Sequence, residues 1–224
     1  MVKGIEDKPV TEWLAARVQN LETPLEFELI TGGHSNLTYK VSDQAGRRWV
    51  LRRPPLGHVL AGAHDMVREH RLLASLAPSD VAVPPVVGLC TDDQINGADF
   101  YVTEFVDGHV LRDGESAEAV DPLHRSRVGD RLIESLAAIH AVDLEATGLA
   151  DLGKREDYVA RQLRTWLRQF NAMTSRSLPL IERVHDALVK KIPTQGESTL
   201  IHGDFRLDNC LVTGEGEVAA GLGW

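Results

Sequence analysis

The stretch HGDFRLDN, residues 202–209, decides the fold and lies close to the last residue of the sequence. It places Asp204 directly after a His-Gly pair and Asn209 five residues further on. An apolar run at 210–212, a glycine-containing turn at 213–216 and a second run at 218–222 follow, and this order predicts a β-hairpin. A turn that leads into a hairpin would hold the two polar side chains on one short segment.

The spacing of Asp204 and Asn209 matches the catalytic loop of phosphoryl-transfer enzymes, in which His-x-Asp is followed by an asparagine. This chemistry needs an acceptor hydroxyl to be oriented, its proton to be received, and a metal ion to be held against the phosphates. Asp204 is the candidate catalytic base, and the amide oxygen of Asn209 is the candidate Mg²⁺ ligand. We expect His202 to brace the loop, and Arg206 either to neutralise phosphate or to pair with a carboxylate such as Asp208.

Two kinds of periodicity divide the rest of the sequence. Alternating apolar residues predict strands at 26–29, 37–42 and 49–52, and two further strand-like runs lie at 86–90 and 100–106. Helical spacing of apolar residues predicts helices over 64–76, 128–139, 159–170 and 181–192. Trp166 and Phe170 are predicted to be core residues of the third of these. The sequence therefore predicts an α+β protein with a sheet lobe at 1–107 and a helical lobe at 108–224.

Composition and charge argue against several classes of protein. The chain has 224 residues, 43% of them hydrophobic, and a formal net charge of -9. Such an acidic chain is a poor candidate for nucleic-acid binding, which needs a basic surface. No apolar run approaches the ~20 residues of a membrane span, and the charged segment 1–8 does not resemble a signal peptide. With only Cys90 and Cys210, we expect a reduced cytoplasmic protein, and the oligomeric state stays open.

The loop motif HGDxxxxN resembles that of the aminoglycoside phosphotransferase family. Further similar stretches occur in the family's order, namely GGHSNLTY at 32–39, WVLRRPP at 49–55 and AHDMVREHRLL at 63–73. Together they resemble the branch that includes the kinase-like domains fused to some acyl-CoA dehydrogenases. The resemblance covers about residues 25–224. It implies a protein-kinase-like two-lobed fold, with a five-stranded antiparallel N-lobe that carries one main helix and an incomplete helical C-lobe.

The resemblance also implies ATP, or alternatively GTP, with Mg²⁺ as cofactors and a small molecule with a hydroxyl group as acceptor. Gly33, Ser35 and Asn36 would belong to the loop that covers the phosphates, through backbone N–H groups and the Ser35 hydroxyl. The alternative is an ordinary glycine turn. Glu104 and Val106 would belong to a hinge whose backbone groups hold adenine, and the alternative is a plain linker.

Arg52 stands where the family places a phosphate-contacting cation on the third strand. Glu69 lies three residues after Met66 and four before Leu73, on the apolar stripe of its helix. A carboxylate that faces a core needs a cationic partner, so we predict an ion pair between Arg52 and Glu69. The alternative is an exposed or locally capped glutamate. Arg53 points to the opposite face of its strand and is predicted to be a surface charge.

Gly223 departs from the family pattern, which places the main Mg²⁺-binding aspartate at this position. The resemblance further implies that helices beyond Trp224 complete the helical lobe and the acceptor pocket. We therefore expect a C-terminally truncated chain with exposed apolar surface on the helices at 122–142 and 156–172. Three functions stay open: a phosphotransferase that moves the γ-phosphate of ATP to a hydroxyl, a catalytically impaired nucleotide-binding module, and an inactive fragment.

Overall fold

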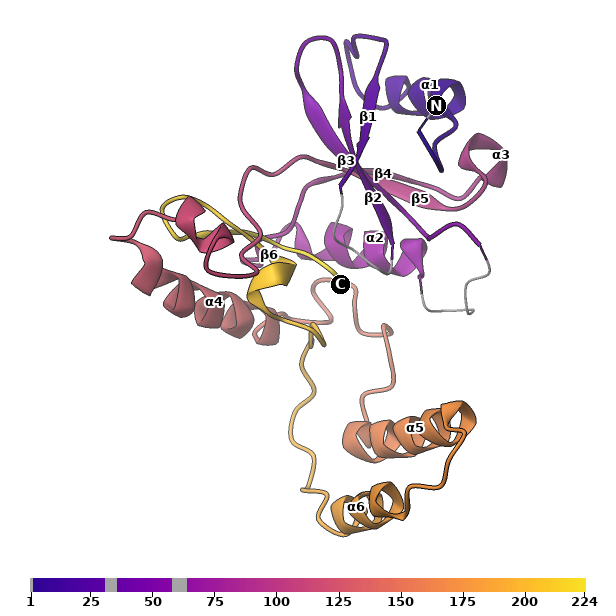
Figure 1. The fold of residues 1–224 in the computed structure, drawn as a ribbon, viewed down its shortest axis with the longest axis vertical. Helices are drawn as coiled ribbons and strands as arrows, with labels where there is room; N and C mark the ends of the chain where they lie inside the picture. The colour runs from indigo at the N-terminus through magenta and orange to yellow at the C-terminus, as the bar shows by residue number, and fades with distance from the viewer. Residues whose placement is uncertain (1, 31–35, 58–63) are drawn as a thin grey trace. The chain divides into compact units, whose positions relative to one another are not determined.

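The computed structural model describes residues 2–30, 36–57 and 64–224. The chain divides into two compact units, one formed by Met1–Asp143 with Ile201–Trp224 and the other by Leu144–Leu200. The first unit contains a five-stranded sheet, a main helix and the C-terminal hairpin (Figure 1). The second unit contains two helices and is described separately below.

The sheet of the first unit is antiparallel throughout, and its strand order is β1-β2-β3-β5-β4. All five predicted strands form, at Glu26–Leu29 (β1), Leu37–Ser42 (β2), Arg48–Arg53 (β3), Val86–Cys90 (β4) and Phe100–Glu104 (β5), the last of which ends before the predicted residue 106. The turn between β2 and β3 is fixed by Asp43, whose carboxylate accepts hydrogen bonds from the backbone N–H and the Nε of Arg47. The predicted antiparallel N-lobe sheet is therefore confirmed.

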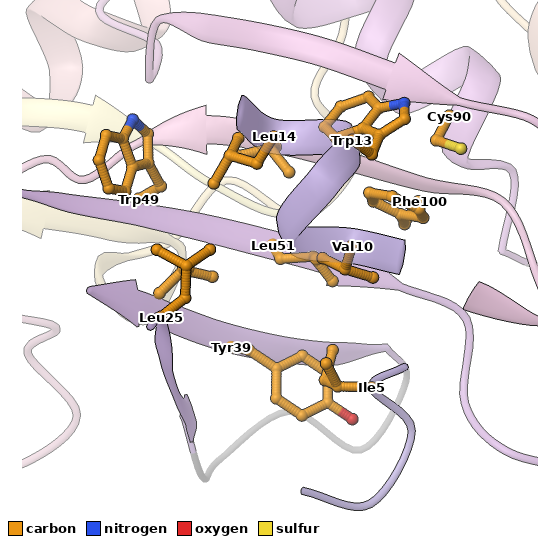
Figure 2. Close-up of a cluster of buried hydrophobic side chains, with 12 residues drawn as sticks. Ile5, Val10, Trp13, Leu14, Leu25, Tyr39, Trp49, Leu51, Cys90 and Phe100 are labelled. Carbon is orange, nitrogen blue, oxygen red and sulfur yellow. The ribbon is translucent and has the colours of Figure 1, made fainter. Parts of the chain in front are cut away.

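One face of the sheet forms the largest apolar core of this unit. Tyr39, Trp49, Leu51 and Phe100 point to it and are almost fully buried. Helix α1 (Asp7–Ala15) covers this face, and Trp13 meets Phe100 edge to face with ring centroids 4.9 Å apart (Figure 2). Side chains that alternate toward this face are therefore enclosed by α1 and the segment before it.

The opposite face carries the main helix, α2 (Met66–Leu76). Its first turn is capped by Asp65, whose carboxylate accepts a hydrogen bond of 2.9 Å from the Arg68 N–H. Met66 and Leu73 pack on Tyr101 of β5. Helix α2 therefore lies against β4 and β5, and its Glu69 reaches Arg52 of β3.

Several further elements belong to the first unit, and the last two of them form the C-terminal hairpin. They are the four-residue helix α3 (Asp93–Asn96), the 3₁₀ turns Ser116–Ala119 and Leu207–Asn209, helix α4 (Arg125–His140), and the strands β6 (Cys210–Val212) and β7 (Val218–Gly221). Helix α4 packs against β7, and Val128 of α4 shares a buried cluster with Cys210 and Val212 of β6. The predicted hairpin and the predicted helix over 128–139 are confirmed, whereas α3 was not predicted.

The second unit contains α5 (Tyr158–Met173) and α6 (Pro179–Val189), which pack on each other. None of the residues in these two helices is buried within the described chain. The prediction that Trp166 is a core residue is wrong here, because 60% of it is exposed. The predicted exposure of apolar surface is confirmed on α5 and also for Leu123 and Ile133 in the first unit.

Among the described residues, none of the helices combines the length and the apolar character needed to cross a membrane.

Candidate active site

The ion pair between β3 and α2 has the predicted partners. Arg52 Nε lies 2.9 Å from Glu69 Oε2, and Glu69 is only 9% exposed. The prediction of an Arg52–Glu69 pair is therefore confirmed. A buried carboxylate is costly unless its oxygens are hydrogen-bonded, and here further donors supply those bonds.

Two neighbouring side chains complete the shell of Glu69. The Tyr101 hydroxyl donates to Oε2 at 3.0 Å, and Asn36 Nδ2 donates to Oε1 at 3.0 Å. Burial and the adjacent Glu69 carboxylate both raise the pKa of the Tyr101 phenol, so this group stays a donor at every physiological pH. Sequence reasoning missed Tyr101, although it is the β5 partner of Arg52 in the strand register.

The side chain of Asn36 is occupied at both ends. Its Oδ1 lies 2.6 Å from His64 Nδ1, and Asn36 is 7% exposed. Any contact between residue 36 and a nucleotide would therefore involve its backbone, as the sequence analysis expected. Gly33 and Ser35 lie outside the described residues. His64 was not predicted, because no periodicity or motif in the sequence links it to Asn36.

Arg53 does not lie on the surface as predicted. It is 6% exposed, and its Nη1 donates to the backbone carbonyls of Gly4 and Asn96. Alternation placed it correctly on the face opposite Arg52, but that face is covered by the N-terminal segment and α3. Burial also lowers the pKa of the Arg53 guanidinium. Arg53 is therefore a structural cation that is held by carbonyl groups.

The catalytic-loop motif brings its two polar side chains together. Asn209 Nδ2 donates to the backbone oxygen of Asp204 at 2.8 Å and to Asp204 Oδ2 at 2.9 Å. Arg206 lies between two carboxylates, with its Nε 3.3 Å from Asp204 Oδ1 and 3.1 Å from Asp208 Oδ1. Arg206 thus has the carboxylate pairing that the sequence analysis gave as one alternative. Asp204 and Arg206 are both exposed, whereas Asn209 is half-buried.

His202 braces this loop, as predicted. Its Nε2 lies 2.8 Å from the Leu222 carbonyl, and its Nδ1 accepts a hydrogen bond of 3.3 Å from the Asp204 N–H. A carbonyl can only accept, so the proton resides on Nε2 and the imidazole is neutral. Burial lowers the pKa of His202, against the opposing effects of the Leu222 carbonyl and Asp204. His202 therefore connects the backbone at Asp204 to the backbone at Leu222 and holds the loop against the hairpin.

The loop is tied to the helix that carries Glu69. The Leu222 N–H donates to the Asn209 carbonyl at 2.8 Å, and the Gly221 N–H donates to the Ala82 carbonyl at 2.9 Å. Trp224 packs against the cluster of Met66 and Leu73, and its ring lies 4.6 Å from that of His202. The loop, the hairpin and α2 therefore form one packed assembly within the first unit.

The predicted hinge is anchored by its own backbone. The Glu104 N–H donates to the Pro85 carbonyl at 2.8 Å, and the Phe105 N–H donates to the Arg48 carbonyl at 3.2 Å. In the described part of the chain, no bond within the fold occupies the Val106 N–H. The carbonyl of Glu104 and the N–H of Val106 thus stay the candidate hydrogen-bond partners of a nucleotide base.

A cavity of about 610 Å³ lies beside the end of β5. Its lining includes Glu104 and Phe105, together with Arg17, Val18, Arg48 and Trp49. Neither Asp204 nor Asn209 lines it, so this cavity does not connect the predicted hinge with the catalytic loop.

Gly223 faces the amide of Asn209. A Cβ at position 223 would lie 3.2 Å from Asn209 Oδ1, and the backbone here has φ of +77°. Mg²⁺ prefers several hard oxygen ligands in octahedral geometry. The described residues contain no group of three or more His, Cys, Asp or Glu side chains that could hold a metal ion. Position 223 therefore offers no carboxylate beside the amide oxygen of Asn209.

Comparisons with known proteins agree with this geometry. A model described as the phosphotransferase enzyme family matches residues 26–222. Acyl-CoA dehydrogenase family member 10 of Mus musculus is 40% identical over 202 residues, which is 90% of this chain and 19% of the mouse protein. A solved Ralstonia eutropha structure assigned to the aminoglycoside phosphotransferases is 34% identical with a TM-score of 0.80, covering 97% of this chain and 64% of that one.

More distant structures share the fold alone. A GDP complex of aminoglycoside 2'-phosphotransferase-IIIa has a TM-score of 0.64 at 16% identity and covers 97% of this chain and 72% of that one. This chain spans about a fifth of the length of the mouse relative and less than two thirds of the Ralstonia chain. The family match extends from β1 to the end of the hairpin and includes both the Arg52–Glu69 pair and the loop with Asp204 and Asn209. The chain therefore belongs to the phosphotransferase enzyme family and has its kinase-like α+β fold.

Proposed function

We propose that this chain supplies the nucleotide site and the catalytic loop of a small-molecule kinase, which moves the γ-phosphoryl group of ATP or GTP to a hydroxyl. The observation that carries this proposal is the bond of 2.9 Å between Asn209 Nδ2 and Asp204 Oδ2, on a loop anchored to α2. The names of solved structures with this fold include complexes with GDP, ATP and ADP. They support a nucleotide as the phosphoryl donor.

In the proposed reaction, Asp204 orients the acceptor hydroxyl and receives its proton. The acceptor oxygen attacks the γ-phosphorus, and the bond from that phosphorus to the β–γ bridging oxygen breaks. The Asp204 carboxylate is exposed, so an acceptor can reach it, and Asn209 holds it by one oxygen. Because the transition state of phosphoryl transfer is loose, orientation contributes more than the basicity of the carboxylate.

Arg52 is the proposed cation for the phosphates. Its Nε is used by Glu69, and its Nη1 lies 3.4 Å from the Thr38 hydroxyl. A guanidinium has five N–H donors, so further donors stay available for phosphate oxygens. We also propose that Gly33 and Ser35 cover the phosphates and that Glu104 and Val106 hold the base.

This assignment makes residues 1–107 the nucleotide-binding part and residues 108–224 the part with the catalytic loop. The two compact units divide the chain elsewhere, after Asp143 and after Leu200. The hydroxyl acceptor is proposed only as a class. Solved structures with this fold carry names that include kanamycin, streptomycin and hygromycin B.

Two assays test the proposal. Calorimetry with ATP and GTP measures binding, and mass spectrometry detects phosphate on a panel of amino alcohols, sugars, hydroxy acids and aminoglycosides. Asp204→Asn keeps the shape of the loop and removes the base, so transfer should fall about 10²-fold or more while nucleotide binding is retained. Unchanged transfer in this variant, or no nucleotide binding by the wild type, would contradict the proposal.

Gly223 favours a second candidate function, a nucleotide-binding module that transfers phosphate poorly. The metal would have to be held by Asn209, phosphate and water alone, so nucleotide affinity should depend little on Mg²⁺. Calorimetry with and without Mg²⁺ separates the two candidates. A requirement for Mg²⁺ favours the kinase, and equal affinities favour the module.

A further inference from the structure

The shell around Glu69 contains more donors than an ion pair requires. One carboxylate oxygen, Oε2, accepts from Arg52 and Tyr101, and the other, Oε1, accepts from Asn36. Both oxygens of the carboxylate are therefore held, and its plane has a single orientation. Without Asn36, Oε1 of this buried carboxylate would lose its hydrogen-bond donor, and the carboxylate would be free to rotate about the Cγ–Cδ bond.

The orientation of the Asn36 amide follows from its partners. The Glu69 carboxylate can only accept, so the NH₂ group of Asn36 must face it, and the amide oxygen must face His64. The distance of 2.6 Å between Asn36 Oδ1 and His64 Nδ1 then requires a proton on Nδ1. His64 is thus a donor that fixes the amide, and the amide is a donor that fixes the carboxylate.

These bonds connect two segments that lie far apart in the sequence. Asn36 directly precedes β2, and His64 directly precedes Asp65, the residue that caps α2. The chain of donors runs from His64 through Asn36 to Glu69, and Glu69 in turn accepts from Arg52. Any change at His64 would therefore reach Arg52 through a single line of hydrogen bonds.

The geometry points to Asn36 and His64 as positioning residues for Arg52, an inference that rests on the proposed role of Arg52 at the phosphates. In this inference neither side chain contacts the nucleotide. Their function is to hold the Glu69 carboxylate so that the Arg52 guanidinium keeps one orientation. Losing this alignment should weaken nucleotide binding about tenfold, the loss that corresponds to one hydrogen bond of a charged group.

Four variants separate positioning from general stability. Asn36→Asp keeps the shape and replaces the donor by a second carboxylate, and His64→Leu removes the donor to the amide. His64→Asn places an amide nitrogen where Nδ1 stood and should restore wild-type affinity. Asn171→Asp makes the same charge change on an exposed residue of α5 and should leave the affinity unchanged.

Nucleotide affinity by calorimetry is the first measurement, with Tm as a check on folding. We expect about tenfold weaker binding for Asn36→Asp and His64→Leu, and no further loss when either is added to Arg52→Ala. Two outcomes would overturn the inference. One is a further loss of affinity when Asn36→Asp or His64→Leu is added to Arg52→Ala. The other is unchanged affinity in Asn36→Asp and His64→Leu although Arg52→Ala alone weakens binding.

A second measurement does not need a nucleotide. The Nε–H signal of Arg52 in a ¹⁵N NMR spectrum should be protected from exchange with water in the wild type and His64→Asn, and lose that protection in Asn36→Asp. If the wild type binds no nucleotide, the proposed function fails, and this signal still decides the positioning role. An Arg52 signal that is equally protected in Asn36→Asp would refute it.

Discussion

At the scale of single residues, Gly223 lies beside the side chain of Asn209 and contributes no side chain of its own. The Cβ position of residue 223 lies 3.2 Å from Asn209 Oδ1, so a carboxylate there would share its environment with that oxygen. Two hard oxygens on adjacent backbone segments, with phosphate and water, would meet the needs of Mg²⁺. We therefore expect the residue at position 223 to decide whether this loop holds a metal.

We predict that Gly223→Asp makes nucleotide binding depend on Mg²⁺. The left-handed backbone at φ of +77° should cost about 1 kcal/mol of stability for a side chain, and aspartate tolerates this conformation better than most residues. Calorimetry with and without Mg²⁺ measures the effect, which we expect to be about tenfold or more in affinity. Gly223→Asn carries the same strain without the charge and should respond less. Equal Mg²⁺ responses in both variants would contradict the prediction.

His202 predicts a pH dependence of stability. Burial lowers its pKa in the folded chain below the ordinary value of 6.5, so the unfolded chain binds the proton first as the pH falls. The contribution of neutral His202 to stability is therefore complete above pH 6.5 and is lost as the pH falls through the folded-state pKa. Denaturant unfolding between pH 5 and 7.5 should show this loss.

The matched variant is His202→Gln, whose amide nitrogen can replace Nε2 as donor to the Leu222 carbonyl. It should flatten the pH dependence in this window. His140→Gln, at an exposed histidine of α4, should leave the wild-type dependence intact. A steep decline with falling pH that persists in His202→Gln would show that other groups cause it.

At the scale of elements, the C-terminal hairpin is held to α2 by Trp224. The indole contacts His202 and packs with Met66 and Leu73, and its Nε1 donates to the Gly221 carbonyl at 3.2 Å. We predict that Trp224→Ala lowers the free energy of unfolding by about 2 kcal/mol, since the ring is half-buried. Amide exchange at residues 202–209 should accelerate because the loop loses its anchor.

Trp166→Ala is the control for this change. Its indole is 60% exposed on α5, so the same substitution should change stability by at most about 0.5 kcal/mol. Denaturant unfolding of the two variants measures both values. Equal losses would mean that the contact between Trp224 and α2 contributes little.

Helices and strands with clearly periodic apolar residues were predictable from the sequence. The contacts between these elements were predictable only in part. Alternation predicted the first three strands and apolar runs predicted the other two. Helical spacing placed Glu69 on the buried face of α2, which led to Arg52 as its partner. Arg53 was assigned to the correct face but to the wrong environment, because alternation does not tell which segment covers a face. The contact of Tyr101 follows from strand register, and that of His64 follows from a loop. Neither contact produces a periodic pattern in the sequence.

At the scale of the whole molecule, the two units differ in how much they bury. The first has an apolar core below α1 and a second cluster under α2, whereas no residue of α5 or α6 is buried in the described chain. Helices that bury little open locally at a low free energy. Exposed apolar surface was predicted for the helices at 122–142 and 156–172. It is found on α5 in the unit Leu144–Leu200, and at Leu123 and Ile133 in the first unit.

Native-state hydrogen exchange should show this difference directly. We predict that amides of α5 and α6 exchange through local openings, while amides of β3 and β5 exchange only at the global free energy of unfolding. Denaturant dependence of the exchange rates distinguishes the two routes. Equal protection of α5 and β3 would show that the two units unfold together.

Leu222 holds the loop by both of its main-chain groups, since its N–H binds Asn209 and its carbonyl binds His202. Because both hydrogen bonds use main-chain groups, they do not depend on the side chain at position 222. Main-chain atoms of Leu222 thus hold the conformation of the loop, whereas side chains carry its proposed chemistry. Substitutions at position 222 should therefore preserve both bonds, whereas side chains at position 223 should change metal affinity at a cost in stability.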